Sequence, residues 1–104
     1  MIESLQSPHV GRVKALLSSK KDRTESKLFV AEGIQGVREA LLIEGEVETL
    51  YLSKAGSERL TKAGVDYSFA NVVEVTDKVA EAMSDAITSQ GIIAICRMPV
   101  QSNE

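Results

Sequence analysis

Apolar residues recur at helical spacing in four segments of the chain. The first follows Ser7-Pro8, a pair typical of an N-cap with proline at the first helical position, where its missing N–H costs no hydrogen bond. The apolar stripe of this helix consists of Val10, Val13, Leu16 and Leu17. The sequence predicts three further helices: residues 34–41 with Gly45 as C-cap, residues 57–63 closed by Gly64, and a helix capped by Thr76 that turns Val79, Ala80 and Met83 inward.

Four short apolar runs between these helices predict strands. The runs are Leu28–Ala31, Val47–Leu52, Val72–Val75 and Ile92–Cys96. Their near-continuous apolar character is typical of strands that are buried on both faces. Strands of this kind that alternate with helices predict an α/β fold, a three-layer α/β/α sandwich around a mostly four-stranded sheet.

The remaining segments are polar and predict connections. Residues 18–26 have no apolar period, and we expect a loop there. Residues 1–97 form the expected domain, and residues 98–104 read as the start of a linker. The chain shows neither repeats nor low-complexity tracts.

Composition narrows the class of protein. With 104 residues, 43% apolar and 26% charged, the chain has the profile of one globular domain. The single cysteine, Cys96, excludes an internal disulfide and a zinc site of the usual cysteine type. Neither a membrane span nor a secretory signal is apparent, so we expect a cytoplasmic protein.

The formal net charge of −3 hides an asymmetry. Residues 1–27 hold six basic and three acidic side chains, whereas residues 28–104 hold six basic and twelve acidic ones. A positive segment on an acidic body is compatible with docking a nucleic acid through one face. The same charges are also typical of a solvated surface loop.

Candidate catalytic chemistry is scarce. The only histidine, His9, has no nucleophile or acid at a recognisable spacing, and Cys96 lies inside an apolar run. Gly33-x-x-Gly36 is too short for a dinucleotide fingerprint. We therefore expect no catalytic residue and no metal ligand, and the residues alone favour a binding domain for RNA or protein.

Several motifs resemble the N-terminal substrate-binding domain of the SpoU/TrmH family of RNA ribose 2′-O-methyltransferases. They run through Ser7-Pro8, Val13-Lys14-x-Leu16, Lys20-Lys21-x-Arg23, Lys27-x-Phe29-Val30-x-Glu32-Gly33, Val37-x-x-Ala40-Leu41, Val72-x-x-Val75 and Ser89-Gln90-Gly91-Ile92-x-Ala94. The resemblance covers residues 4–96. The chain departs from the family pattern at Ser7, where asparagine is common, and at Ser26, where glycine is frequent.

The resemblance implies a fold like that of kink-turn-binding ribosomal proteins. In the family, a linker joins this domain to a trefoil-knotted domain that binds S-adenosylmethionine, carries the catalytic arginine and forms the homodimer. We therefore expect this chain to be the RNA-binding part of a ribosomal or transfer RNA 2′-O-methyltransferase, without its own cofactor and monomeric. The alternatives are a stand-alone kink-turn binder and a protein-interaction module.

Long cationic side chains near the start of the chain are the candidates for phosphate contacts. The predicted RNA-binding residues are Lys14, Lys20, Lys21, Arg23, Lys27 and Gln90. Arg23 matches the family residue by residue, and its structural alternative is an ion pair with Glu32. Glu32, Gly33 and Gly91 are expected to shape turns, with Glu32 at the start of a helix. Tyr67 and Phe69 could stack on bases, whereas Phe29 is more typical of a core.

Overall fold

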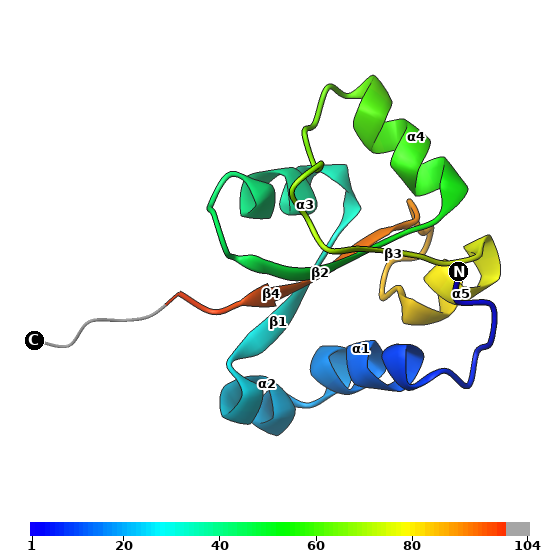
Figure 1. Ribbon diagram of the computed structural model, residues 1–104. Coiled ribbons are helices and arrows are strands. Elements are labelled where there is room, and N and C mark those ends of the chain that lie inside the picture. Colours follow the sequence, from blue (N-terminus) through cyan, green and yellow to red (C-terminus); the bar gives the residue numbers. More distant parts are fainter. Residues whose placement is uncertain (100–104) are drawn as a thin grey trace, which may run out of the picture.

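The computed structural model describes residues 1–99 and contains five helices and four strands in this range (Figure 1). The helices are α1 (Pro8–Ser18), α2 (Lys20–Ser26), α3 (Gly33–Leu41), α4 (Lys54–Lys62) and α5 (Asp77–Met83). The strands are β1 (Leu28–Glu32), β2 (Val47–Leu52), β3 (Val72–Glu74) and β4 (Ile92–Arg97). All four predicted strands are confirmed. The predicted linker lies mostly outside the described residues.

The four strands form one mixed sheet in the order β1-β4-β2-β3. β4 is antiparallel to both of its neighbours, whereas β2 and β3 run parallel. In this register Leu28 pairs with Arg97 and Glu32 pairs with Ile93. β1 therefore begins where β4 ends, and the two ends of the sheet carry different loops.

Helices cover both faces of the sheet (Figure 1). Tyr51, Ile93 and Ile95 point into a core with α1 and α5. Their strand neighbours Leu52 and Ala94 point into a second core with α3 and α4. Because side chains alternate between faces along a strand, two separate cores follow from continuous apolar strands. This confirms the predicted α/β fold with helices on both faces.

The predicted loop over residues 18–26 is wrong, because residues 20–26 form α2. The Ser19 side chain caps this helix by accepting from the Asp22 N–H at 3.1 Å, and Lys27 ends it in a left-handed conformation with φ 60°. α2 buries no residue, so it has no apolar stripe from which periodicity could reveal it.

Two other boundaries differ from the sequence expectation. α4 begins at Lys54, not Ser57, because Ser53 at the end of β2 serves as its N-cap. Gly45 has the positive φ of 80° expected of a turn, yet α3 already ends at its C-cap Leu42. Gly45 instead shapes the turn that leads into β2.

Candidate functional site

The predicted cationic residues lie around the junction of α1 and α2. Lys14 is on the exposed side of α1, one residue separates the two helices, and Lys20 and Lys21 open α2. Lys27 follows α2, and its carbonyl accepts a hydrogen bond from the Met98 N–H at 2.9 Å. We call Lys14, Lys20, Lys21 and Lys27 the basic corner. It borders the point where the chain leaves the sheet after β4.

Arg23 has a different environment from the lysines. Its Nη1 donates to the carbonyl oxygens of Leu16 at 2.6 Å and Leu17 at 3.1 Å, in the last turn of α1. These carbonyls lack partners within their own helix, so a guanidinium stabilises that end both by hydrogen bonding and through the helix dipole. The expected alternative, an ion pair between Arg23 and Glu32, is wrong. Arg23 fastens α2 to α1.

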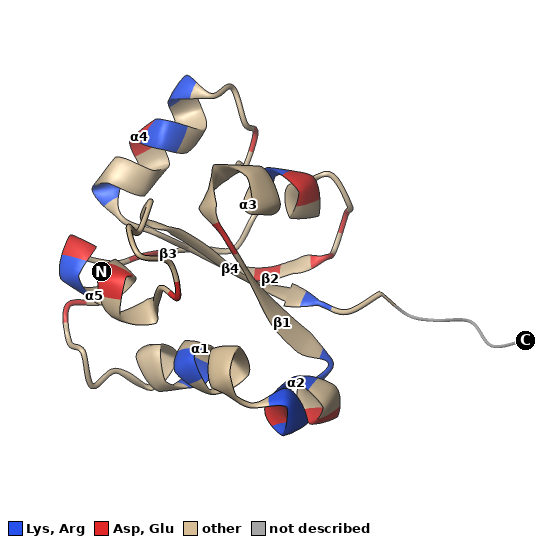
Figure 2. Cartoon of the chain, turned by 180° about the vertical axis from the view of Figure 1, so that it is seen from behind, with Lys and Arg blue, Asp and Glu red and all other residues tan. Residues whose placement is uncertain are grey.

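No carboxylate within residues 1–99 forms an ion pair with a basic-corner lysine, since the one ion pair there joins Arg12 and Glu48. α2 also carries Asp22 and Glu25, and Figure 2 shows basic and acidic segments together on this short helix. On a helical projection Asp22 lies opposite Lys20, so the lysine arc keeps its own sign. The basic corner is locally positive although the whole chain is acidic.

A polar network joins α1 to β2. The Tyr51 hydroxyl forms a 2.7 Å hydrogen bond with Nδ1 of His9, and Arg12 donates to Glu48 at 2.7 Å. This bond lowers the pKa of Glu48 and raises that of Arg12, whereas burial raises the pKa of Tyr51. The only histidine therefore has a structural partner, and the network positions α1 on the sheet.

Gln90, Glu32, Gly33 and Gly91 form a second group, which we call the turn cluster. Oε1 of Gln90 accepts from the Ile34 N–H at 2.7 Å and supplies the cap that α3 lacks from its own N-cap residue, Glu32. Glu32 accepts from the Ser84 hydroxyl and from the Asp85 N–H. Gly33 and Gly91 have φ values of 86° and 75°, which agree with their expected turn roles.

The two groups lie at opposite ends of the sheet. Lys27 precedes Leu28, whereas Glu32 and Gly33 end the same strand, about 13 Å further along by strand geometry. The structure therefore brings the basic-corner lysines together and separates them from Gln90. A single compact contact surface cannot contain all six predicted RNA-binding residues.

α4 is a cationic element that the sequence analysis missed. It carries Lys54, Arg59 and Lys62 against one carboxylate, Glu58. Half of the basic residues in residues 28–104 thus fall in nine positions (Figure 2). The signal was present in the sequence, but averaging the charge over residues 28–104 concealed it.

The aromatic candidates also separate. Phe29 packs against the core beneath α3, as expected. The Tyr67 hydroxyl forms a 2.7 Å hydrogen bond with Ser57 and a longer one with Thr61, and these bonds lower the pKa of Tyr67. Phe69 is 60% exposed. Base stacking by Tyr67 and Phe69 stays a prediction.

Other classes of site find no support among residues 1–99. Cys96 is fully buried, and burial raises the pKa of its thiol to about 11. No group of three potential metal ligands occurs in this range. The longest helix there has 11 residues, and none has the length and apolar character needed to cross a bilayer.

Together, the fold and its surface charges define a small α/β binding domain. The chain belongs to the MRM3-like substrate binding domain family, whose model matches residues 8–94. A search of curated proteins returns no match. Family membership and the solved structures described next confirm the predicted resemblance to the SpoU/TrmH methyltransferases.

Three solved structures illustrate the similarity. An rRNA methyltransferase from Sinorhizobium meliloti matches with 27% identity and a TM-score of 0.72, over 96% of this chain and 37% of that one. An RNA 2′-O ribose methyltransferase matches with 26% identity and a TM-score of 0.77, over 99% and 39%. The SpoU methyltransferase AviRb from Streptomyces viridochromogenes, in complex with AdoMet, shares the fold at 16% identity and a TM-score of 0.66, over 92% and 35%. The chain thus spans less than two fifths of each structure.

Proposed function

We propose that this chain is the RNA-binding, substrate-recognition domain of an AdoMet-dependent RNA 2′-O-ribose methyltransferase. The observation that carries the proposal is the basic corner: lysines without carboxylate partners within residues 1–99, at the end of the sheet where the chain departs. The relatives described above are RNA methyltransferases, which supports the same assignment.

The basic corner would bind the phosphate backbone. Lysines on two adjoining helix ends supply flexible positive charge without reading bases, as expected of contacts that position a nucleic acid. Arg23 acts as a positioning residue, because its guanidinium holds α2 against α1. At the far end, Oε1 of Gln90 holds α3, so its NH2 group is the part that would donate to RNA.

The domain would contribute to methylation through proximity and orientation of the target ribose. AdoMet, which the AviRb structure contains, supplies the methyl group in that complex. The cavity of about 820 Å³ beside α4 is a groove open to solvent and does not fit a cofactor whose reactive centre must be shielded, so no step is derived through AdoMet here. The expected homodimer through another domain and a monomeric state for this chain stay predictions.

The test measures binding of a labelled RNA hairpin to the chain over a series of KCl concentrations. Each phosphate contact adds about 0.9 to the slope of log affinity against log salt. The double variant K20Q/K21Q should therefore weaken binding and reduce the slope by about 2. A matched control, R38Q/K78Q, removes the same charge from exposed positions on α3 and α5 and should leave the slope almost unchanged.

Two results would contradict the proposal. A salt-independent affinity would exclude phosphate binding as its source. Equal losses in K20Q/K21Q and R38Q/K78Q would show that net charge matters and the basic corner does not. Retained hairpin binding in both variants, with binding to a protein partner lost, would favour the protein-interaction alternative.

A further inference from the structure

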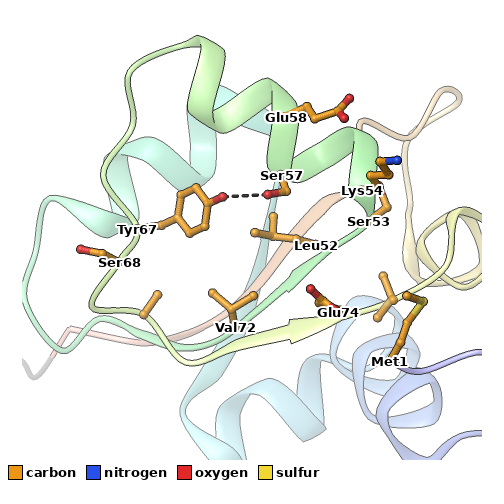
Figure 3. Close-up of a pocket in the computed structure, with 12 residues that line it drawn as sticks. Met1, Leu52, Ser53, Lys54, Ser57, Glu58, Tyr67, Ser68, Val72 and Glu74 are labelled. Carbon is orange, nitrogen blue, oxygen red and sulfur yellow. Dashed lines mark hydrogen bonds between the residues drawn. The ribbon is translucent and has the colours of Figure 1, made fainter.

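A groove runs between α4, the segment that follows it and the edge strand β3. Its volume is about 820 Å³, within the usual range for small-ligand sites. Leu52 and Val72 line its floor, Tyr67 stands on one side, and Ser57, Lys54 and Glu58 of α4 stand on the other (Figure 3). The proposed RNA contacts of the basic corner do not use it.

The walls of the groove are held in place by specific contacts. Ser57 and Tyr67 join α4 to the segment before β3 through their 2.7 Å hydrogen bond (Figure 3). Gly56, on the buried side of α4, packs against the carbonyl of Gly91 so closely that no larger residue fits. The groove is therefore formed before any ligand arrives, and binding would cost little ordering.

The floor opens at the edge of the sheet. β3 is an outer strand of three residues, and only its end is covered, where Ile2 bridges to Val75. Val72 is 37% exposed, so the floor offers apolar area that lacks a partner within residues 1–99. A flat ligand that lies on Val72 against the Tyr67 ring would cover it.

The charges around the groove have a definite order. Lys54, Glu58 and Lys62 follow one another at i, i+4 spacing along α4, with Lys54 and Glu58 on the groove wall. The two lysines lie roughly 12 Å apart along the helix axis. The floor ends at Glu74, a second carboxylate. A phosphate is repelled from the floor and attracted to the outer helix surface, whereas an uncharged heterocycle meets no such barrier inside.

We propose that this groove binds one unpaired nucleotide of the RNA substrate, with its base between Tyr67 and Val72 and its backbone along Lys54 and Lys62. Aromatic side chains commonly stack with splayed bases in RNA recognition. The positive helix surface favours this polyanion over an acidic or neutral peptide as occupant. The inference rests on the proposed RNA-binding function and adds a site that selects unpaired over paired RNA.

The polar groups of the groove give it a base preference. Carboxylates accept hydrogen bonds from exocyclic amino groups, such as N4 of cytosine, and cannot donate to a carbonyl. Glu74 on the floor therefore favours cytosine over uracil in the groove. Replacement of Glu74 by glutamine, which both donates and accepts, should remove much of this preference.

The test compares two labelled hairpins that differ by one bulged cytosine. The wild-type chain should bind the bulged hairpin about tenfold more tightly, the order of one stacked base. Y67L removes the ring, and V72M fills the floor with a side chain that has no ring; both should bring the ratio of the two affinities close to one. E74Q should instead narrow the difference between bulged cytosine and bulged uracil.

The controls separate this site from the basic corner. I43M makes a similar change at an exposed position at the end of α3 and should keep the tenfold ratio. K20Q/K21Q should weaken both hairpins equally and leave the ratio unchanged. Thermal unfolding of each variant identifies loss of the fold, and V72M on the exposed edge keeps the test valid if Y67L unfolds.

Three outcomes would overturn the inference. Equal wild-type affinities for the two hairpins would show that the chain does not select an unpaired nucleotide. A tenfold ratio preserved in V72M, or lost as fully in I43M, would place selection elsewhere. If neither hairpin binds at low salt, the proposed RNA-binding function itself fails, whereas hairpin binding without the bulge preference removes the groove alone.

Discussion

Gly56 of α4 lies directly against the carbonyl oxygen of Gly91, which a Cβ atom at position 56 would approach to 1.9 Å. Gly91 is itself confined, because it has a φ of 75° and its own Cβ would come within 2.0 Å of the Ser53 hydroxyl. The two glycines let α4 pack at the start of β4. Their contact fixes the helix that forms one wall of the groove.

Alanine at position 56 should destabilise the chain by about 3 kcal/mol, since backbone, not a flexible side chain, occupies the required space. Gly11 offers a matched control, because it is exposed on α1 and a Cβ there meets nothing within 4 Å. G11A should stabilise the chain by about 0.5–1 kcal/mol. Urea unfolding measures both changes, and a G56A variant as stable as the wild type would contradict the packing described.

The elements with an apolar stripe were predictable from sequence. Val10, Val13 and Leu16 are buried as their spacing indicates, and all four strands occur where continuous apolar runs predict them. α2 was missed, since its stability comes from a serine cap and from Arg23 reaching back to α1. Periodicity reports only on burial, and α2 buries nothing.

The candidate site was predictable as a list of residues but not as an arrangement. Nothing local in the sequence indicates that Gln90 caps a helix starting 56 positions earlier, or that Glu32 binds the loop at Ser84. Both contacts depend on β1 and β4 being neighbours in the sheet. The same topology places Lys27 and Gln90 at opposite ends, a separation that spacing along the chain cannot give.

Replacement of Arg23 by glutamine should lower the free energy of unfolding by about 1–2 kcal/mol, because two carbonyls at the end of α1 lose a charged donor. K21Q removes a charge from the same helix but no described hydrogen bond, and should change stability by less than about 0.5 kcal/mol. Denaturant titration compares the two. If R23Q is as stable as K21Q, Arg23 does not serve as the link between α1 and α2.

The side chain of Gln90 can be tested by separating its hydrogen bond from its charge. Q90A removes the acceptor at the N-terminus of α3 and should cost about 1 kcal/mol. Q90E keeps an acceptor and adds negative charge where the helix dipole favours it, so its stability should equal or exceed that of the wild type. Hairpin affinity supplies the second measurement: Q90E should weaken RNA binding if the Gln90 NH2 group contacts RNA, and equal affinity would make this residue purely structural.

The Arg12–Glu48 pair gives the fold a measurable acid sensitivity. The hydrogen bond from Arg12 lowers the pKa of Glu48 in the folded chain below the reference value of 4.5. Its stabilisation is therefore present above that value and lost as pH falls through the folded pKa. The side chains are 42% and 25% exposed, so the loss should be less than about 1 kcal/mol and smaller in high salt. Unfolding of E48Q between pH 6 and about 3 should lack this component, and parallel curves for the two proteins would contradict it.

Cys96 should produce the opposite dependence in alkali. Burial raises the pKa of its thiol from 9.0 to about 11, so the unfolded chain releases this proton at lower pH than the folded chain. Stability from this group is complete below 9.0 and declines as pH rises toward about 11, by at most about 2–3 kcal/mol. C96A should lose this decline while keeping the contributions of lysine and tyrosine titration, so the difference between the two unfolding curves isolates the thiol. A thiol reagent gives an independent measurement: at pH 8 it should modify Cys96 only as fast as the chain unfolds, and rapid modification of the folded chain would show that the thiol is accessible.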